Sequence, residues 1–169
     1  MTNSVIDTIK GMHQNNVSGS YLIILRLTLG FTFLTTLGSN FLKGVFTEEG
    51  YKKLINDFLK LNAQTPYNTI VEQIIIPNAQ IFMVIQIIVE LFIAFTLIFG
   101  IFTRFGSIIG VFVSFNLLFL TLGVDWIWSY LLMVAGFLIT GFNSAGKWYG
   151  IDYWLEKRIN NRFLHFIMF

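Results

Sequence analysis

Four long apolar stretches, separated by polar or turn-forming segments, form the main pattern of the sequence. They cover about residues 21–41, 79–102, 105–123 and 126–142. A helix of about 20 apolar residues crosses a hydrocarbon core about 30 Å thick. The pattern therefore predicts an all-α membrane protein, a bundle of four transmembrane helices in a single membrane domain over residues 1–169.

The segment between the first two apolar stretches, about residues 42–78, is too long for a simple turn. Its apolar residues recur with the spacing of one helix face: Tyr51, Leu54, Ile55, Phe58 and Leu59. Thr65 and Pro66 suit the start of a second short helix that runs to about Ile76. We expect this amphipathic insertion to lie on the external side of the bilayer.

The tail over residues 150–169 also alternates apolar and basic positions with helical spacing. The residues of this pattern are Trp154, Leu155, Lys157, Arg158, Ile159, Arg162 and Phe163. Such a helix lies in the membrane surface, where anionic lipid headgroups attract its basic face. We therefore expect a C-terminal interfacial helix and direct contact with the lipid bilayer.

Basic residues are distributed unevenly between the two faces that four spans define. The face that holds both termini has six: Lys10, Arg104, Lys147, Lys157, Arg158 and Arg162. The opposite face has four, Lys43, Lys52, Lys53 and Lys60, together with several acidic residues. The positive-inside rule then predicts a multi-pass protein of the plasma membrane with both termini in the cytoplasm.

Composition restricts the chemistry that the chain performs by itself. The sequence is 55% hydrophobic and has no cysteine, which excludes thiolate catalysis, cysteine-ligated iron–sulfur clusters and c-type haem. His13 and His165 lie outside the apolar stretches, so a haem between two histidines has no ligands there. We find no flavin or dinucleotide motif and no metal-binding cluster. A dispersed net charge of +2 also argues against a nucleic-acid partner.

Two ionisable residues fall inside the apolar stretches, where they are costly unless paired or facing water. Arg26 stands about six residues into the first stretch and Glu90 near the middle of the second. At 1.5 Å per residue they lie about 9 Å and about 18 Å from the same membrane edge, a gap that a long arginine could largely cover. They indicate either architecture (an ion pair, or a snorkelling Arg26 and a protonated Glu90) or a ligand or proton site.

Other notable residues have structural interpretations. Arg104 fits the positive-inside rule at the turn after the second stretch. Asp125 and Asp152 are suited to cap the helices that follow them. Gly106 and Gly110 have the small-xxx-small spacing that lets two helices approach closely.

Four short motifs, taken in order, resemble those of the DoxX/DoxD family of four-helix membrane proteins. They are Arg26-Leu-Thr-Leu-Gly30, Glu90-Leu-Phe-Ile-Ala, Phe99-Gly-Ile-Phe-Thr-Arg104 and Ala145-Gly-Lys-Trp-Tyr-Gly-Ile-Asp152. Lys147 stands where an arginine is commoner in the family, which keeps the charge and gives up bidentate geometry. The external insertion and the Trp-rich start of the last apolar stretch are most similar to the DoxD type.

The resemblance implies a membrane subunit of thiosulfate:quinone oxidoreductase, with a DoxA-like small subunit and an archaeal sulfur-oxidising setting. Such an enzyme joins two thiosulfates into tetrathionate and passes the electrons to a membrane quinone, which a terminal quinol oxidase then uses. Arg26 and Glu90 are the candidate catalytic residues, and Arg104 joins them as a candidate quinone ligand. The candidate thiosulfate ligands are Lys43, Asn40 and Gln80.

Two other functions remain open from the sequence. One is a non-catalytic accessory subunit that packs on a haem–copper quinol oxidase through the face of Gly106 and Gly110. The other is a small anion or proton carrier in which Glu90 acts as a relay. The sequence lacks the helix breaks expected at a transporter's binding site, which places the carrier last.

Overall fold

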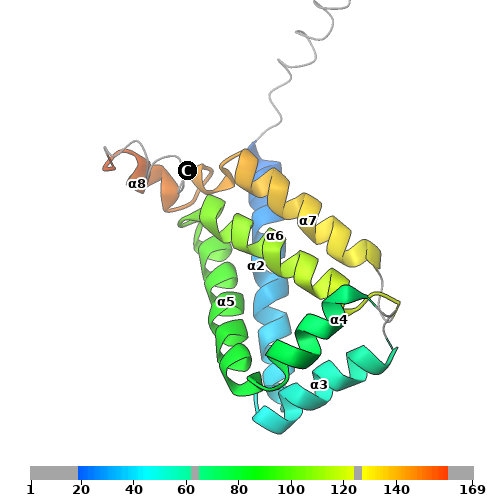
Figure 1. Cartoon of the computed structure of the whole chain (residues 1–169). Helices are drawn as coiled ribbons and strands as arrows, with labels where there is room; N and C mark the ends of the chain where they lie inside the picture. The colour runs from blue at the N-terminus through cyan, green and yellow to red at the C-terminus, as the bar shows by residue number, and fades with distance from the viewer. Residues whose placement is uncertain (1–18, 62–64, 124–126, 160–169) are drawn as a thin grey trace, which may run out of the picture.

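The computed structural model of the chain describes residues 19–61, 65–123 and 127–159. All regular secondary structure in these ranges is helical (Figure 1). The predictions that concern Lys10, the two histidines, Asp125 and residues 160–169 lie outside the described residues.

Three helices in these ranges are long and apolar enough to cross a membrane: α2 (Gly19–Leu42), α5 (Ala79–Phe99) and α6 (Thr103–Leu120). Their bounds agree with the predicted stretches to within about three residues. The fourth apolar helix, α7 (Ile127–Phe142), has 16 residues and is shorter than the others. At 1.5 Å per residue it is about 24 Å long, so its role as a fourth span stays a prediction.

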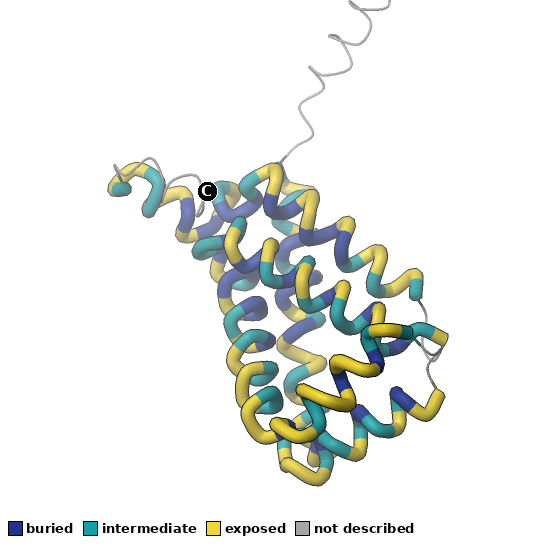
Figure 2. Tube along the Cα trace, viewed as in Figure 1, coloured by how far each residue is buried: buried dark blue, intermediate teal, exposed yellow. Residues whose placement is uncertain are grey.

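Each long helix buries a narrow face inside the bundle and exposes large apolar side chains on its outer face. α2 packs along α5, and α6 packs along both α7 and α5. Their shared core consists of Leu29, Phe33, Ile93, Ala94, Leu97 and Phe137. The outward faces of these helices are exposed along most of their length (Figure 2), and many of their exposed residues are Ile, Leu and Phe. This distribution suits a solvent of lipid rather than water.

The amphipathic insertion forms as predicted between α2 and α5. It consists of α3 (Glu48–Leu61), α4 (Pro66–Ile70) and the π-helical turn η1 (Val71–Ile75). The buried face of α3 carries Tyr51, Ile55 and Leu59, which pack with Val71 and Ala79 into a second core. The insertion thereby covers one end of the bundle, which we call the insertion end (Figure 1).

The opposite end, which we call the terminal end, has a short C-terminal element. After α7 the chain forms the 3-10 turn η2 (Ala145–Lys147) and then α8 (Asp152–Glu156). Figure 1 shows α8 projecting sideways past the end of α5. In the described part of the tail, the expected interfacial helix is therefore only one short helix, which ends at Glu156.

Gly106 and Gly110 serve packing within the chain. A Cβ atom at Gly106 would overlap Thr96 of α5, and one at Gly110 would overlap the ring of Phe137 of α7. The close approach expected from their spacing is therefore present. However, both partners belong to this chain, so this face is not open to an oxidase as the accessory-subunit hypothesis requires.

This packing predicts that Gly110→Ala destabilises the bundle. Phe137 is fully buried, so its ring has no room to move away from the added methyl group. We expect the free energy of unfolding in detergent to fall by roughly 1–3 kcal/mol. Gly38→Ala is the matched control, because Gly38 also lies in a helix and has no atom within 4 Å of the Cβ position. Equal thermal midpoints for the two variants would contradict the close α6–α7 packing.

Candidate functional site

Arg26 is buried at the terminal end of the bundle. Only 2% of the residue is exposed, and its Nη1 donates a hydrogen bond of 3.3 Å to the carbonyl of Ala145. Gly100 and Gly150 line the guanidinium so closely that a Cβ atom at either position would overlap Nη1. These two glycines therefore make the space that the arginine occupies.

Asp152 holds the turn between α5 and α6 from the other end of the sequence. Its carboxylate accepts hydrogen bonds from the backbone N–H groups of Phe102 (2.7 Å) and Thr103 (3.0 Å). The backbone N–H groups of Ile151 and Asp152 donate in turn to the carbonyls of Phe99 (3.2 Å) and Gly100 (2.8 Å). Asp152 thus caps α6, and the prediction that it caps the tail helix is wrong.

The reason for this capping lies in the backbone of the turn. Gly100 and Phe102 both have left-handed φ values, of 64° and 51°, which end α5 and restart the chain as α6 within three residues. The N–H groups at the start of α6 have no partner in their own helix. Burial raises the pKa of Asp152, while the hydrogen bonds from Thr103 and Phe102 and the charge of Arg26 act in the opposite direction.

We name this set of residues the terminal junction: Arg26, Gly100, Ala145, Gly150 and Asp152. It joins the start of α2, the α5–α6 turn and the segment before α8 by bonds that end mainly on backbone atoms. Apart from Nε of Arg26, which has no hydrogen-bond partner in the described structure, the polar side-chain atoms of the junction hold these segments together. The arrangement is that of an architectural clamp.

Two hollows flank the terminal junction. A groove of about 940 Å³ lies between the end of α5 and residues 147–156, with Trp148, Tyr149, Tyr153 and Trp154 among its walls. Lys147 pairs there with Glu156 at 2.5 Å. Aromatic side chains of this kind gather at membrane–water interfaces. Arg104 lines the second hollow, a cavity of about 260 Å³ between α6 and α7.

Glu90 is buried in the middle of α5, far from the terminal junction. It is 4% exposed, and its Oε1 accepts a hydrogen bond of 2.8 Å from Nε2 of Gln86, one turn earlier. Its Oε2 is buried and has no hydrogen-bond partner among the described residues. An unpaired acceptor in such surroundings costs free energy of the order of 1–3 kcal/mol, so it calls for an explanation beyond packing.

Arg26 and Glu90 do not meet. The guanidinium of Arg26 lies against Gly100, which follows Glu90 by ten positions at the end of α5. That separation corresponds to about 15 Å along the helix. The gap that the side chain of Arg26 was expected to cover is therefore not bridged, and the guanidinium is committed to Ala145 and to the charge of Asp152.

Two tyrosines of the insertion belong to the core that packs against the first part of α5, the helix that carries Glu90. Tyr51 of α3 is 6% exposed, and Tyr67 of α4 donates a hydrogen bond of 2.8 Å to Oδ1 of Asn116 in α6. Burial raises the pKa of Tyr51 to about 12, and the negative charges of Tyr67 and Glu90 add to the shift. Tyr51 is therefore close enough to sense the charge of Glu90, and it stays protonated at physiological pH.

We name these residues the cap site: Tyr51, Tyr67, Gln86, Glu90 and Asn116. Sequence reasoning found Glu90 and treated Tyr51 only as an apolar member of an amphipathic face. Gln86 carried a usable signal, because residues four apart on a helix are neighbours. Nothing in the local sequence pointed to Tyr67 or Asn116, whose bond joins segments 49 positions apart.

A comparison with protein-family models identifies the chain. The model of the DoxX family matches residues 21–124. The chain belongs to the DoxX family. Searches of curated proteins and of solved structures found no match to it.

The DoxX match covers the whole cap site and two of the five residues of the terminal junction. It runs from α2 through α6 and includes Arg26 and Gly100, whereas Ala145, Gly150 and Asp152 lie beyond it. This DoxX-family membrane protein thus uses a segment outside the matched region to bury its arginine.

The three candidate thiosulfate ligands all lie at the insertion end of this DoxX protein. Lys43 is exposed directly after α2, Asn40 is half-buried at the end of that helix, and Gln80 is exposed at the start of α5. The carbonyl of Asn40 accepts a hydrogen bond from Val45. The structure thus brings the three residues to one end of the molecule.

The terminal junction predicts a stability loss for Asp152→Asn. The amide keeps one acceptor oxygen and places an N–H group where the second backbone donor now binds, so one buried donor loses its partner. We expect a loss of roughly 1–3 kcal/mol in the free energy of unfolding. Asp57→Asn is the control, because Asp57 is exposed and its ion pair with Lys60 is a surface contact. Equal thermal midpoints for the two variants would show that Asp152 does not stabilise the α5–α6 turn.

Proposed function

We propose that this DoxX-family protein is the membrane subunit of a quinone-linked oxidoreductase, and that Glu90 exchanges a proton during reduction of the quinone. The observation that carries the proposal is the buried Oε2 of Glu90, which has no partner in the described structure. An ionisable residue inside a membrane span marks a functional site by default. Glu90 is the acidic residue of α5, the most hydrophobic of the three candidate spans.

The donor set fits a quinone carbonyl. A protonated carboxyl donates a hydrogen bond to such an oxygen and then releases its proton to it, as general acids do. Gln86 fixes one oxygen of Glu90 and leaves the other to act. Ile93 and Ala94, the next buried residues on the same face of α5, exclude water from the carboxyl. A bound quinone supplies the redox chemistry, in which it takes up two electrons and two protons.

This assignment narrows the set of candidate quinone ligands. Arg26 is committed to the terminal junction, about 15 Å from Glu90 along α5. Arg104 begins the first turn of α6 at the same terminal end. Because these arginines lie far from Glu90, one quinone ring cannot contact all three side chains. We therefore assign the quinone to Glu90 and Gln86, and architecture to Arg26.

We infer thiosulfate as the electron donor. Two thiosulfates form one S–S bond and give tetrathionate with loss of two electrons, and these electrons reduce the quinone. A dianion needs cations that water can reach, and Lys43 with Asn40 and Gln80 offers part of such a site at the insertion end. A DoxA-like small subunit completes this site and carries the electron path. The topology we propose has α7 as the fourth span and the insertion outside an archaeal plasma membrane.

The accessory-subunit hypothesis has less support. It relied on the face of Gly106 and Gly110, which contacts Thr96 and Phe137 of this chain. It also leaves the unpaired oxygen of Glu90 without a purpose. Co-purification with a haem–copper oxidase, without thiosulfate-dependent activity, would nevertheless favour it over the enzyme.

Glu90→Gln tests the proposed function directly. The substitution keeps the size of the side chain and removes the exchangeable carboxyl proton. General acid–base groups contribute about 10²–10⁴-fold to rates, so we expect thiosulfate-driven quinone reduction to fall at least about 100-fold. The assay uses the complex extracted gently from native membranes, and the protein level in the extract confirms folding.

Glu72→Gln is the matched control. Glu72 lies in η1, where it is exposed, and the substitution makes the same chemical change. We expect its activity to equal that of the unmodified complex. Full activity of the complex that carries Glu90→Gln would overturn the assignment of Glu90.

A further inference from the structure

The two directions that lead away from Glu90 differ in polarity. Toward the terminal end, the next interior residues on α5 are Ile93, Ala94, Thr96 and Leu97, all at most 1% exposed. Phe137 of α7 joins the three apolar residues of this set in the same closed core. The first polar side chain on this part of the buried face of α5 is Thr96, six positions beyond Glu90, and its hydroxyl donates to the carbonyl of Ile93 in its own helix.

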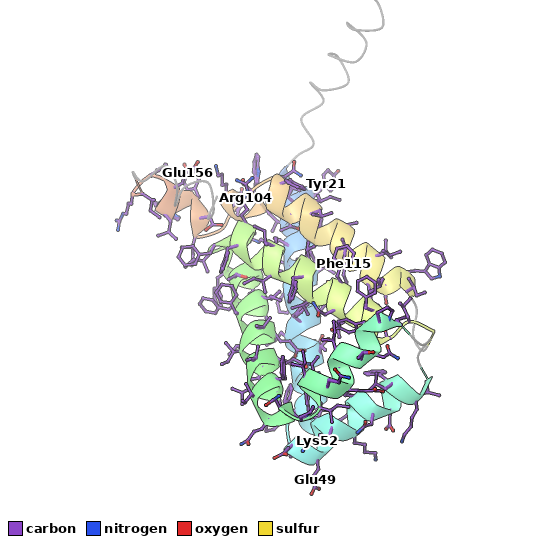
Figure 3. All side chains as sticks on the ribbon, in the orientation of Figure 1. Tyr21, Glu49, Lys52, Arg104, Phe115 and Glu156 are labelled. Atoms are coloured by element: carbon purple, nitrogen blue, oxygen red, sulfur yellow. The ribbon has the colours of Figure 1, made fainter. Side chains whose placement is uncertain are left out.

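Toward the insertion end, polar groups follow one another. Gln86 is hydrogen-bonded to Glu90 and is half-buried, so the interior begins to open one turn away. Tyr51 lies within electrostatic range of Glu90, and Tyr67 lies within range of Tyr51. Both tyrosines belong to the core that α3 and α4 form against the start of α5. Figure 3 shows Glu49 and Lys52 on the outer side of α3, at the end of the molecule opposite Arg104 and Glu156.

We propose that Glu90 exchanges its proton with the water at the insertion end, past Gln86 and by way of the Tyr51 hydroxyl. The insertion is then the proton entrance of the membrane site, and α3 is its outer wall. This inference rests on the proposed function for its physiological use. The route itself is a property of the chain and is measurable without quinone or thiosulfate.

The ionisable groups around Glu90 are consistent with one open side. α2, α3 and α6 pack against α5. In the described ranges α2 carries only Tyr21 and Arg26 and α6 only Arg104, all toward the terminal end. Tyr51 of α3 is therefore the described ionisable group whose charge interacts with that of Glu90, and Tyr67 of α4 interacts in turn with Tyr51.

The chemistry of the route requires no stable charge on tyrosine. A phenol hydroxyl accepts a proton on one lone pair and gives up its own, so it passes a proton on while it stays neutral. The O–H bond of the Glu90 carboxyl breaks, a carboxylate remains, and the proton leaves with water at the insertion end. The reverse sequence reloads the carboxyl from the same side.

Labelling with dicyclohexylcarbodiimide tests the route. This apolar reagent reacts with protonated carboxyl groups in membranes, and the adduct on Glu90 is read as a mass increase of its peptide. The full-length protein is prepared in right-side-out and inverted membrane vesicles. Reaction of the lysines of α3 with a membrane-impermeant reagent shows which side holds the insertion. The Glu90→Gln variant lacks the reactive carboxyl, so its labelling measures the background signal.

We expect labelling of Glu90 to fall when pH is raised on the insertion side and to stay unchanged when pH is raised on the other side. Labelling that follows the pH of the terminal side, or of both sides equally, would overturn the proposal. Absence of labelling at every pH would overturn it as well, because the carboxyl would then not be loaded with a proton.

Tyr51→Phe tests the hydroxyl itself. The ring stays in the insertion core and only the oxygen is lost. We expect the change in labelling after a jump in insertion-side pH to become several-fold slower. Tyr149→Phe is the matched control, because Tyr149 is 90% exposed at the terminal end. Equal rates in the two variants would remove Tyr51 from the route.

The outcomes separate this inference from the proposed function. If Glu90→Gln leaves thiosulfate-driven quinone reduction intact, the proposed function fails, and the labelling result stands by itself. If Glu90→Gln stops turnover but the labelling of Glu90 does not change with the insertion-side pH, the proposed proton route is wrong and the proposed function stands. The infrared band of the protonated carboxyl, identified by its loss in Glu90→Gln, repeats the pH series without the reagent.

Discussion

The cost of placing an ionisable side chain in hydrocarbon governs how this bundle is built. Arg26 meets that cost by folding the two ends of the sequence together. Its guanidinium lies in space left by Gly100 and Gly150 and donates to Ala145. Asp152 contributes a compensating charge and caps α6 with the same carboxylate. Neither charge would be tolerable at this depth without the other elements of the terminal junction.

Glu90 is the second ionisable side chain, and the bundle treats it differently. Only one of its oxygens is satisfied, by a neighbour on its own helix. Nε of Arg26 is also buried without a hydrogen-bond partner, but the charge of Asp152 compensates the guanidinium, whereas no cation among the described residues compensates Glu90. The unpaired oxygen therefore indicates a group kept available for exchange, which is why the terminal junction is assigned to architecture and the cap site to chemistry.

Sequence periodicity was sufficient for the helices and insufficient for the contacts between them. The bounds of α2, α5 and α6, the buried face of α3 and the start of α4 at Pro66 all followed from local spacing. The capping of α6 by Asp152 did not, because its partners lie 49 and 50 positions away and a helix start follows Asp152 directly. Gly106 and Gly110 were correctly expected to allow close packing, but spacing alone does not tell whether the partner helix belongs to the same chain.

The two ends of the bundle differ in polarity, and this difference gives the proton route of Glu90 its direction. At the terminal end, backbone and side-chain bonds tie the junction together, and the buried face of α5 between it and Glu90 is apolar except for Thr96, whose hydroxyl is bonded within the helix. At the insertion end, an amphipathic helix contributes a buried tyrosine whose charge interacts with that of Glu90. Phenylalanine would have filled that core nearly as well, because it has almost the same shape and lacks only the hydroxyl. Since a tyrosine hydroxyl in such a core is costly unless it has a polar partner, we attribute its presence within electrostatic range of Glu90 to the proton that the two groups handle together.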